Sequence, residues 1–264
     1  MNELQAIIIS IVEGLTEFLP VSSTAHMKFA NPMVGVSSNA FTEMFEVVIQ
    51  LAAILAVVVL YFKKFVNVKS PNFYLKLVIA VIPSLVFGYL LKSHIDSALG
   101  NLVFIACVMI GGGLILLFVD DWFKNPKIHK EEEIKNVTAF NIGVFQVLSI
   151  LLPGLSRSAA TIIGGMSQKL SRETAAEFSF FLAVPTMFAA SAKSGYDAYK
   201  LDNNVFAGNN LTLLLIGSAV AFIVSIFAMK FFVGIVKKYG FRPFGVYRIL
   251  AGIAMLVLIW KGVI

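Results

Sequence analysis

Cysteine and charge are both scarce in this chain. One cysteine, Cys107, occurs among 264 residues, so a framework of intramolecular disulfides is excluded. Cys/His zinc spacing, a phosphate-binding Walker loop and a dinucleotide fingerprint are all missing. Charged residues make up only 14% of the chain, which leaves no basic soluble face for a nucleic acid. Residues 1–5 contain no positive charge, so we expect no cleaved signal peptide.

Apolar residues are abundant instead. They form 58% of the chain, and the mean hydropathy is +0.87. A membrane-spanning helix needs roughly 17–25 mostly apolar residues. Six runs approach this length: 44–62, 77–91, 101–119, 176–192, 211–229 and 246–260. Two more apolar stretches, 4–21 and 137–156, are interrupted by proline and polar clusters. The sequence therefore predicts an all-α integral membrane protein with six spanning helices and two irregular segments.

The two irregular segments resemble each other, and so do the halves that contain them. A shift of 133 residues without a gap pairs Leu19 with Leu152, Pro20 with Pro153, Ser23 with Ser156 and Phe45 with Phe178. Related halves in a membrane protein indicate broken helices that meet near the bilayer midplane. We predict one transmembrane domain, 1–264, with pseudo-repeats 1–120 and 134–264 joined by a linker, 121–133.

Positive charge predicts the orientation of the loops. Loops on one side carry twelve Lys and Arg residues: Lys63, Lys64, Lys69, Lys124, Lys127, Lys130, Lys135, Lys169, Arg172, Lys237, Lys238 and Arg242. The other side carries five: Lys28, Lys92, Lys193, Lys200 and Lys261. Since cytoplasmic loops hold the excess of positive charge, the first set is predicted to be cytoplasmic. The two halves then have inverted topologies.

Both irregular segments are predicted to be re-entrant helical hairpins. Pro20 and Pro153 disfavour helix at the residue before them, so a helix is expected to end there. Small polar residues follow each proline and suit a turn and a new helix N-terminus. Such an N-terminus directs free N–H groups at an anion. The alternative is an ordinary proline-kinked span.

Polar groups at the two turns indicate phosphoryl transfer. Glu13 and Glu17 are four residues apart and share one helix face, which suits a shared cation or proton. Arg157 lies in the second turn, and its planar fork of donors matches phosphate oxygens. Hydroxyl groups and a histidine complete the set: Ser22, Ser23 and His26 in the first turn, and Ser156, Ser158 and Thr161 in the second. A base, a hydroxyl, a histidine and an arginine together fit that chemistry.

We predict that Ser23 is the nucleophile, because the repeat pairs Ser23 with Ser156, beside Arg157. Either His26 or Glu17 would accept its proton, and Glu13 would hold a cation or tune Glu17. In the competing mechanism an activated water attacks directly. Two further charged residues are weighed: Glu46 either lines the site or caps an interface, and Arg248 is assigned a structural role because an unpaired charge inside a span is costly.

Two segments, 13–26 (EGLTEFLPVSSTAH) and 153–161 (PGLSRSAAT), resemble the signature segments of the undecaprenyl-diphosphate phosphatase family of the bacitracin-resistance type. Segments 45–50 and 241–248 resemble the family as well, so the likeness covers essentially the whole chain. Ala25 and Ala159 depart from it, standing where glycine is expected.

The resemblance implies removal of the terminal phosphate from a C55 lipid carrier, on the outer side of the bacterial plasma membrane, with a role in cell-wall synthesis and antibiotic resistance. It implies an active-site set of Glu13, Glu17, Ser22, Ser23, His26, Ser156, Arg157, Ser158 and Thr161, and a divalent cation. Glu13 and Glu17 are compatible with Mg²⁺ or Ca²⁺. The partners are a polyprenyl diphosphate and membrane lipids, with no nucleic acid.

A transporter or flippase of an anionic polyprenyl lipid is the alternative function, because inverted repeats with broken helices are transporter architecture. Two acids beside a phosphate favour the phosphatase. Oligomeric state stays open, with a homodimer as one option.

Overall fold

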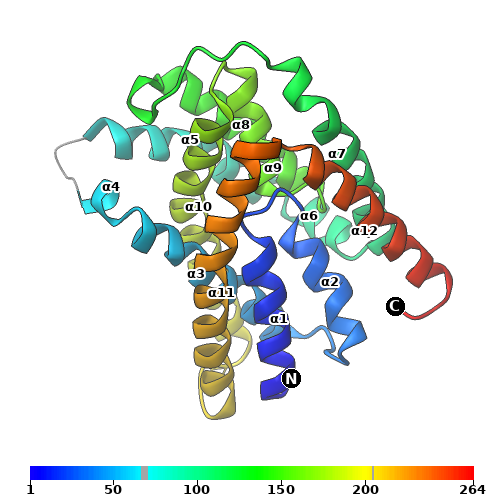
Figure 1. Ribbon diagram of the computed structural model, residues 1–264. Coiled ribbons are helices and arrows are strands. Elements are labelled where there is room, and N and C mark those ends of the chain that lie inside the picture. Colours follow the sequence, from blue (N-terminus) through cyan, green and yellow to red (C-terminus); the bar gives the residue numbers. More distant parts are fainter. Residues whose placement is uncertain (67–70, 204) are drawn as a thin grey trace.

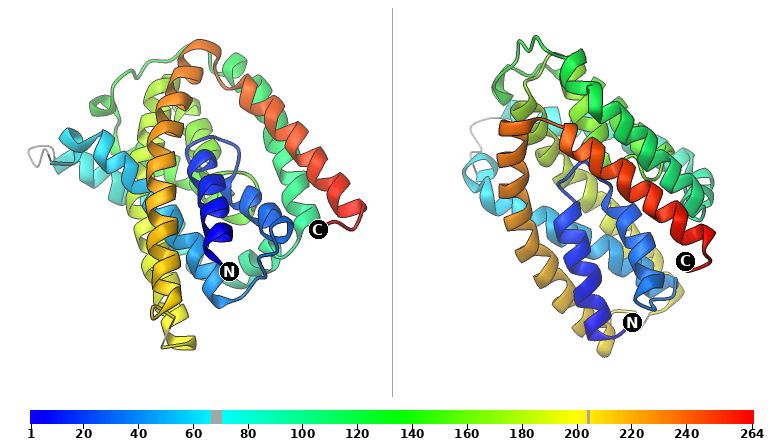
Figure 2. Two further views of the ribbon diagram at one scale, coloured as in Figure 1. Left: turned by 60° about the horizontal axis from the view of Figure 1, so that its bottom comes forward. Right: turned by 45° about the vertical axis from the view of Figure 1, so that its right-hand side comes forward.

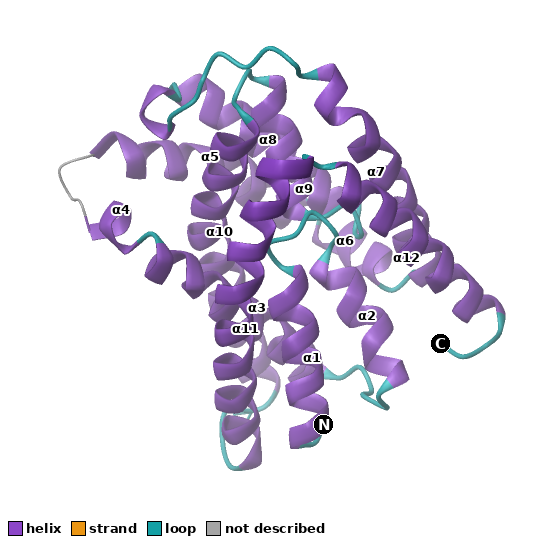
Figure 3. Ribbon diagram, viewed as in Figure 1, coloured by secondary structure: helices purple, strands orange, loops and turns teal. Residues whose placement is uncertain are grey.

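The computed structural model describes residues 1–66, 71–203 and 205–264, and these residues form helices and connecting loops with no strand (Figure 3). Lys69, counted above among the cytoplasmic charges, lies outside the described residues. Six helices of the described part are long and apolar enough to cross a membrane. They are α3 (Ala40–Leu60), α5 (Pro71–Leu90), α7 (Leu102–Trp122), α10 (Arg172–Leu201), α11 (Asn209–Tyr239) and α12 (Arg242–Trp260). The chain is a multi-pass, all-helical membrane protein, as predicted.

Four shorter helices lie where the interrupted apolar stretches were expected. They are α1 (Glu3–Thr16), α2 (Ser23–Met33), α8 (Asn136–Leu151) and α9 (Arg157–Ser167). In Figure 1, α1 and α2 run together below the centre, whereas α8 and α9 lie above it. Helix α1 packs on α11, and α8 packs on α5. The turn between α1 and α2 meets the turn between α8 and α9, since the Ser158 hydroxyl donates to the Leu19 carbonyl at 3.0 Å.

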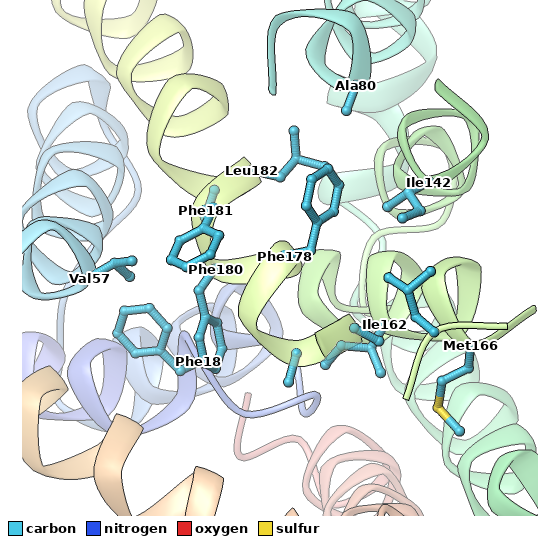
Figure 4. Packing of buried hydrophobic residues seen from close by; sticks show 14 of the residues in the cluster. Phe18, Val57, Ala80, Ile142, Ile162, Met166, Phe178, Phe180, Phe181 and Leu182 are labelled. Atoms are coloured by element: carbon cyan, nitrogen blue, oxygen red, sulfur yellow. The ribbon is translucent and has the colours of Figure 1, made fainter. Parts of the chain in front are cut away.

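Phenylalanines fill the core beside these turns (Figure 4). Phe18 is the second residue after α1 and is fully buried, with its ring edge-on to Phe180 of α10 at 5.3 Å between centroids. Phe178 and Phe181 of the same helix are also fully buried. Edge-to-face aromatic pairs add to the packing energy of the buried area. The backbone at the neighbouring Glu17 is therefore fixed by the packing of buried phenylalanines.

Arg248 of α12 ties both turns to α7. The side chain is fully buried, and its guanidinium donates to five backbone carbonyls. These belong to Pro20 (2.9 Å), Gly154 (2.8 Å), Leu155 (2.6 Å), Met109 (3.2 Å) and Val108 (3.4 Å). Carbonyls at broken helices lack intrahelical partners, and inside a membrane protein they must be satisfied internally. The predicted structural role of Arg248 is confirmed by this network. Helices α7 and α12 lie side by side (Figure 2).

The predicted linker forms a small ion-paired unit with the helices beside it. It contains the 3₁₀ turn η1 (Glu131–Glu133) and packs near α4 (Phe62–Val66). Lys64 of α4 donates to Glu132 at 2.7 Å, which lowers the pKa of that carboxyl. The ammonium of Lys76 in α5 is buried and contacts Glu131 at 3.1 Å. One further helix, α6 (Lys92–Leu99), joins α5 to α7.

Candidate active site

A cavity of about 1410 Å³ opens where the two turns meet. The first turn contributes Glu17, Ser22, Ser23 and Thr24 to its wall, and the second contributes Ser156, Arg157 and Ser158. Further parts of the wall come from α2, the α2–α3 loop, α3, the α5–α6 corner, the start of α7, the end of α8 and α10. Most of the residues predicted to form the site therefore share one cavity, although they come from segments more than 130 residues apart.

Glu17 is the centre of the polar contacts in this cavity. Its Oε2 accepts a hydrogen bond from the Ser23 hydroxyl at 2.5 Å. Its Oε1 accepts from Nη2 of Arg157 at 2.6 Å. One carboxylate thus connects the serine of the first turn to the arginine of the second. Hydrogen bonds to charged groups are the short, strong ones, so this carboxylate fixes the positions of both partners.

Arg157 is held from two sides. Its Nη1 donates to the backbone carbonyl of Ser179 at 3.1 Å, and its own carbonyl accepts from Thr161 at 2.9 Å. Thr161 also hydrogen-bonds the Ser179 hydroxyl at 2.6 Å. Thr161 does not line the cavity; it supports Arg157 from behind. Within the described residues Nε of Arg157 is buried without a partner, whereas the side chain as a whole keeps 13% of its surface exposed and lines the cavity.

The two turns match with an offset of 134 residues, not 133. Helix α2 begins at Ser23 after the N-cap Ser22, and α9 begins at Arg157 after the N-cap Ser156. Both N-caps have left-handed φ angles, 71° and 76°. The prediction that pairs Ser23 with Ser156 is therefore wrong for this segment, because Ser22 is the counterpart of Ser156. Between the proline and the N-cap the second turn is one residue longer, and this stretch includes Gly154, whose φ of 99° favours glycine.

This offset separates the roles of the two neighbouring serines. The Ser22 hydroxyl accepts from the backbone N–H of Ala25 at 3.4 Å and so caps α2. Ser23 is the first residue of α2, and its hydroxyl reaches Glu17. Positive φ in a residue other than glycine costs on the order of 1–3 kcal/mol and is concentrated at functional sites. In the second turn Ser156 caps α9, and its hydroxyl lies 2.9 Å from that of Ser158.

The two alanines that replace expected glycines lie in the first turns of α2 and α9. Helical backbone needs no glycine, and alanine is the best helix former. Ala25 and Ala159 are almost fully buried, and neither lines the cavity. Their methyl groups therefore fill the packing behind the turns and leave the cavity wall unchanged.

His26 is placed away from the Ser23 hydroxyl. Its Nδ1 lies 2.8 Å from the Ser22 carbonyl, and its Nε2 lies 2.8 Å from the hydroxyl of Tyr247. The two rings are stacked at 5.6 Å with an angle of 8°. A carbonyl only accepts, so Nδ1 carries the proton, and in the neutral ring Nε2 accepts from Tyr247. Of the two bases considered for Ser23, the structure brings Glu17 to it; His26 instead holds the backbone of the turn.

Glu13 lies one helical turn before Glu17 and is fully buried. Within the described residues both of its carboxylate oxygens lack a hydrogen-bond partner. A carboxylate left so in a low-dielectric region calls for a proton or a cation. No group of three or more His, Cys, Asp and Glu side chains suited to a metal occurs in the described part of the chain. Glu13 does not line the cavity. Of the two predicted metal ligands it is the one with unpaired oxygens, since both oxygens of Glu17 are hydrogen-bonded.

The sequence analysis left one part of the cavity wall undecided and missed another. Glu46 of α3 lines the cavity, so the first of its two weighed placements is correct. Asn31 donates to Glu46, and the ammonium of Lys28 lies 3.3 Å from Glu46 Oε2. Lys28 and Asn31 were not predicted as site residues. Their spacing from Thr24, four and then three residues, was the available signal, because such residues share one helix face.

These observations define the class: a polytopic membrane protein whose two broken-helix turns hold a serine, a carboxylate and an arginine at one internal cavity. The sequence profile of the family described as "Bacitracin resistance protein BacA" matches residues 6–254, and the chain belongs to this family. The resemblance stated above is confirmed.

Three relatives show how far the similarity extends, and each carries the name undecaprenyl-diphosphatase. The relative from Flavobacterium psychrophilum is 52% identical, over 98% of this chain and 96% of its own length. The one from Porphyromonas gingivalis is 48% identical, over 100% and 99%. The one from Bdellovibrio bacteriovorus is 43% identical, over 99% and 98%. The similarity therefore spans both turns and all six long helices.

Proposed function

We propose that this chain hydrolyses undecaprenyl diphosphate to undecaprenyl phosphate and inorganic phosphate. This reaction recycles the lipid carrier for cell-wall synthesis, and the family name associates it with bacitracin resistance. The relatives are named for this activity. The observation that carries the proposal is the contact of Glu17 with both Ser23 and Arg157 inside the cavity. This set places a nucleophile, its base and an anion-binding donor around one space.

The chemistry follows from these positions. The Ser23 oxygen attacks the terminal phosphorus in line while its proton moves to Glu17, and the bond from that phosphorus to the bridging oxygen breaks. Undecaprenyl phosphate leaves with the bridging oxygen. Water then attacks the phosphoserine, and the bond from phosphorus to the Ser23 oxygen breaks. The Glu17 proton returns to that oxygen, and the protons of the water leave with the inorganic phosphate. Arg157 balances the charge on the transferring phosphoryl oxygens.

The helix N-termini add to this electrostatic environment. Helices α2 and α9 both begin at the cavity, and their first N–H groups and partial positive charges favour an anion there. The left-handed N-caps at Ser22 and Ser156 set the direction in which the two helices begin. His26 and Thr161 stabilise these helix starts, since each forms a hydrogen bond to the backbone there.

A divalent cation fits the same proposal through Glu13. Mg²⁺ commonly binds one or two carboxylates together with substrate phosphates and keeps several waters. When bound, such an ion would offset negative charge from behind the cavity wall; Glu13 would hold it, one helical turn from Glu17. In the steps above, the Ser23 proton moves to Glu17 and back.

Phosphate release by the purified protein in detergent tests the function. We expect undecaprenyl diphosphate and a shorter polyprenyl diphosphate to release inorganic phosphate, with activity lost on chelation and restored by Mg²⁺ or Ca²⁺. The alternative function, a flippase of an anionic polyprenyl lipid, predicts lipid translocation in vesicles with no phosphate release. That result would contradict the proposed phosphatase function. Full activity in the presence of a chelator would show that the reaction needs no divalent cation.

We further propose that the halves are inverted and that the α1–α2 and α8–α9 pairs are re-entrant hairpins opening to opposite sides. The meeting of their turns supports this, as does the excess of Lys and Arg in one set of loops. The protein would then lie in the bacterial plasma membrane with the cavity open to the outer side. There the connection from α2 to α3 and the α5–α6 corner contribute to its wall.

Cysteine labelling in intact cells tests this orientation. Cys107 is exposed and is first replaced by alanine. A cysteine at Ser37, in the exposed loop after α2, is expected to react with an impermeant maleimide from outside. Cysteines at Asn125 and Lys238, both exposed, are expected to react only after the membrane is permeabilised. Labelling of Ser37→Cys and Asn125→Cys from the same side would contradict the inverted arrangement.

A further inference from the structure

Three lysines that the proposed reaction does not yet use line this cavity, Lys28, Lys92 and Lys193, and of these Lys28 lies on the same helix as Ser23. It lies on α2 and lines the cavity together with Thr24 and Asn31, at helix positions that share one face. Its side chain is 20% exposed, so a ligand in the cavity reaches it. Its ammonium contacts Glu46 at 3.3 Å, and within the described residues this ion pair is the only polar contact the structure gives it. An ammonium has three donors, so two or more remain for a ligand.

The direction of the helix brings this ammonium toward the reacting end of the cavity. Side chains on an α-helix lean toward the helix N-terminus, and the N-terminus of α2 is Ser23. Five residues of helix correspond to roughly 7.5 Å along the axis. A lysine side chain can span part of this distance, and Lys28 and Ser23 line the same cavity. Arg157 and Lys28 thus face one cavity from two different helices.

Charge balance also favours a further cation beside Arg157. The positive charge of Arg157 is already paired with Glu17 at 2.6 Å, and a diphosphate brings two or more negative charges into the cavity. Glu46 does not depend on Lys28 alone, since it also accepts a hydrogen bond from Asn31. Lys28 is therefore able to share its charge with a ligand while Glu46 keeps a partner.

We propose that Lys28 binds the phosphate that stays on the lipid, so that this cavity selects a diphosphate over a monophosphate. The proposal rests on the function proposed above and specifies that the site binds diphosphates. In the reaction, negative charge develops on the departing undecaprenyl phosphate, and Lys28 stabilises it.

Binding of two non-hydrolysable probes to purified protein in detergent tests this selectivity without relying on turnover. Methylenediphosphonate has both phosphoryl groups, whereas methylphosphonate has only one. In Lys28→Met, which keeps the length of the side chain and removes its charge, we expect the Kd of methylenediphosphonate to rise about tenfold or more. The Kd of methylphosphonate is expected to stay within about twofold. Lys28→Arg, which retains the charge, is expected to retain most of the selectivity.

A double variant separates a phosphate contact from mere neutralisation of Glu46. If Lys28 only neutralises Glu46, then adding Glu46→Gln to Lys28→Met should restore methylenediphosphonate binding. The proposal predicts no restoration. Equal loss for both probes in Lys28→Met, or no loss for either, would also overturn it. If the protein fails to release phosphate yet shows the predicted probe selectivity, the proposed hydrolysis is refuted, whereas the proposed phosphate contact of Lys28 is supported.

Discussion

Replacing Ser23 with alanine is expected to lower turnover by a factor on the order of 10³ or more, as loss of a covalent nucleophile does. The Ser23 hydroxyl is the one that donates to Glu17, at 2.5 Å, inside the cavity. Phosphate release gives the rate. Substrate carrying a radioactive terminal phosphate should label the wild-type protein transiently and leave Ser23→Ala unlabelled.

Ser22→Ala is the matched control for that experiment. It removes a hydroxyl from the adjacent residue, but that hydroxyl caps α2 at the N–H of Ala25. The expected effect is a loss of stability of about 1 kcal/mol, with turnover reduced far less than in Ser23→Ala. Substantial turnover in Ser23→Ala, with no labelling of the wild-type protein, would instead support attack by a water that Glu17 activates. That result would leave the phosphatase function intact but would contradict the assignment of Ser23 as the nucleophile.

Replacing Arg157 with lysine is expected to reduce turnover by on the order of 10²–10³, although the charge is kept. The guanidinium contacts Glu17 and the Ser179 carbonyl through two separate nitrogens, and the side chain lines the cavity. A lysine ammonium cannot reproduce this planar set of donors. Steady-state kinetics should show the loss mainly in kcat if the contact strengthens in the transition state.

Arg172→Lys makes the same substitution at the other end of the protein. Arg172 begins α10, and its side chain is 41% exposed and paired with Asp120 at 2.5 Å. We expect near-normal turnover there, because partly exposed ion pairs contribute little. Near-normal turnover in Arg157→Lys as well would remove Arg157 from the mechanism.

Hydropathy predicted the six long helices because a spanning segment leaves a direct record of about 20 apolar residues in the sequence. The two breaks were predictable from Pro20 and Pro153 for a similar reason, since proline removes a backbone donor at a fixed place. Glu17 and Arg157 were predictable as site residues because charge inside apolar surroundings is costly and needs a function.

The offset between the turns could not be predicted in the same way. The repeat comparison assumed no insertion, and the extra residue is absorbed by Gly154, whose backbone conformation has no trace in hydropathy. The partner of His26 was also hidden, because Tyr247 is 221 residues away and only the packing of α12 beside α2 brings the rings together. Sequence proximity suggested His26 as the base for Ser23, whereas the fold gives that contact to Glu17.

Arg248 has a consequence for biosynthesis. The carbonyls of Pro20, Gly154 and Leu155 receive their donors from α12, which the ribosome makes after both turns. Until that helix inserts, the two turns lack the side chain that joins them, and their carbonyls must find temporary partners such as water. A nascent chain therefore passes through a stage in which Ser23, Glu17 and Arg157 are already synthesised but the turns that position them are not yet joined by Arg248. The active site can form only after α12 is made, late in translation.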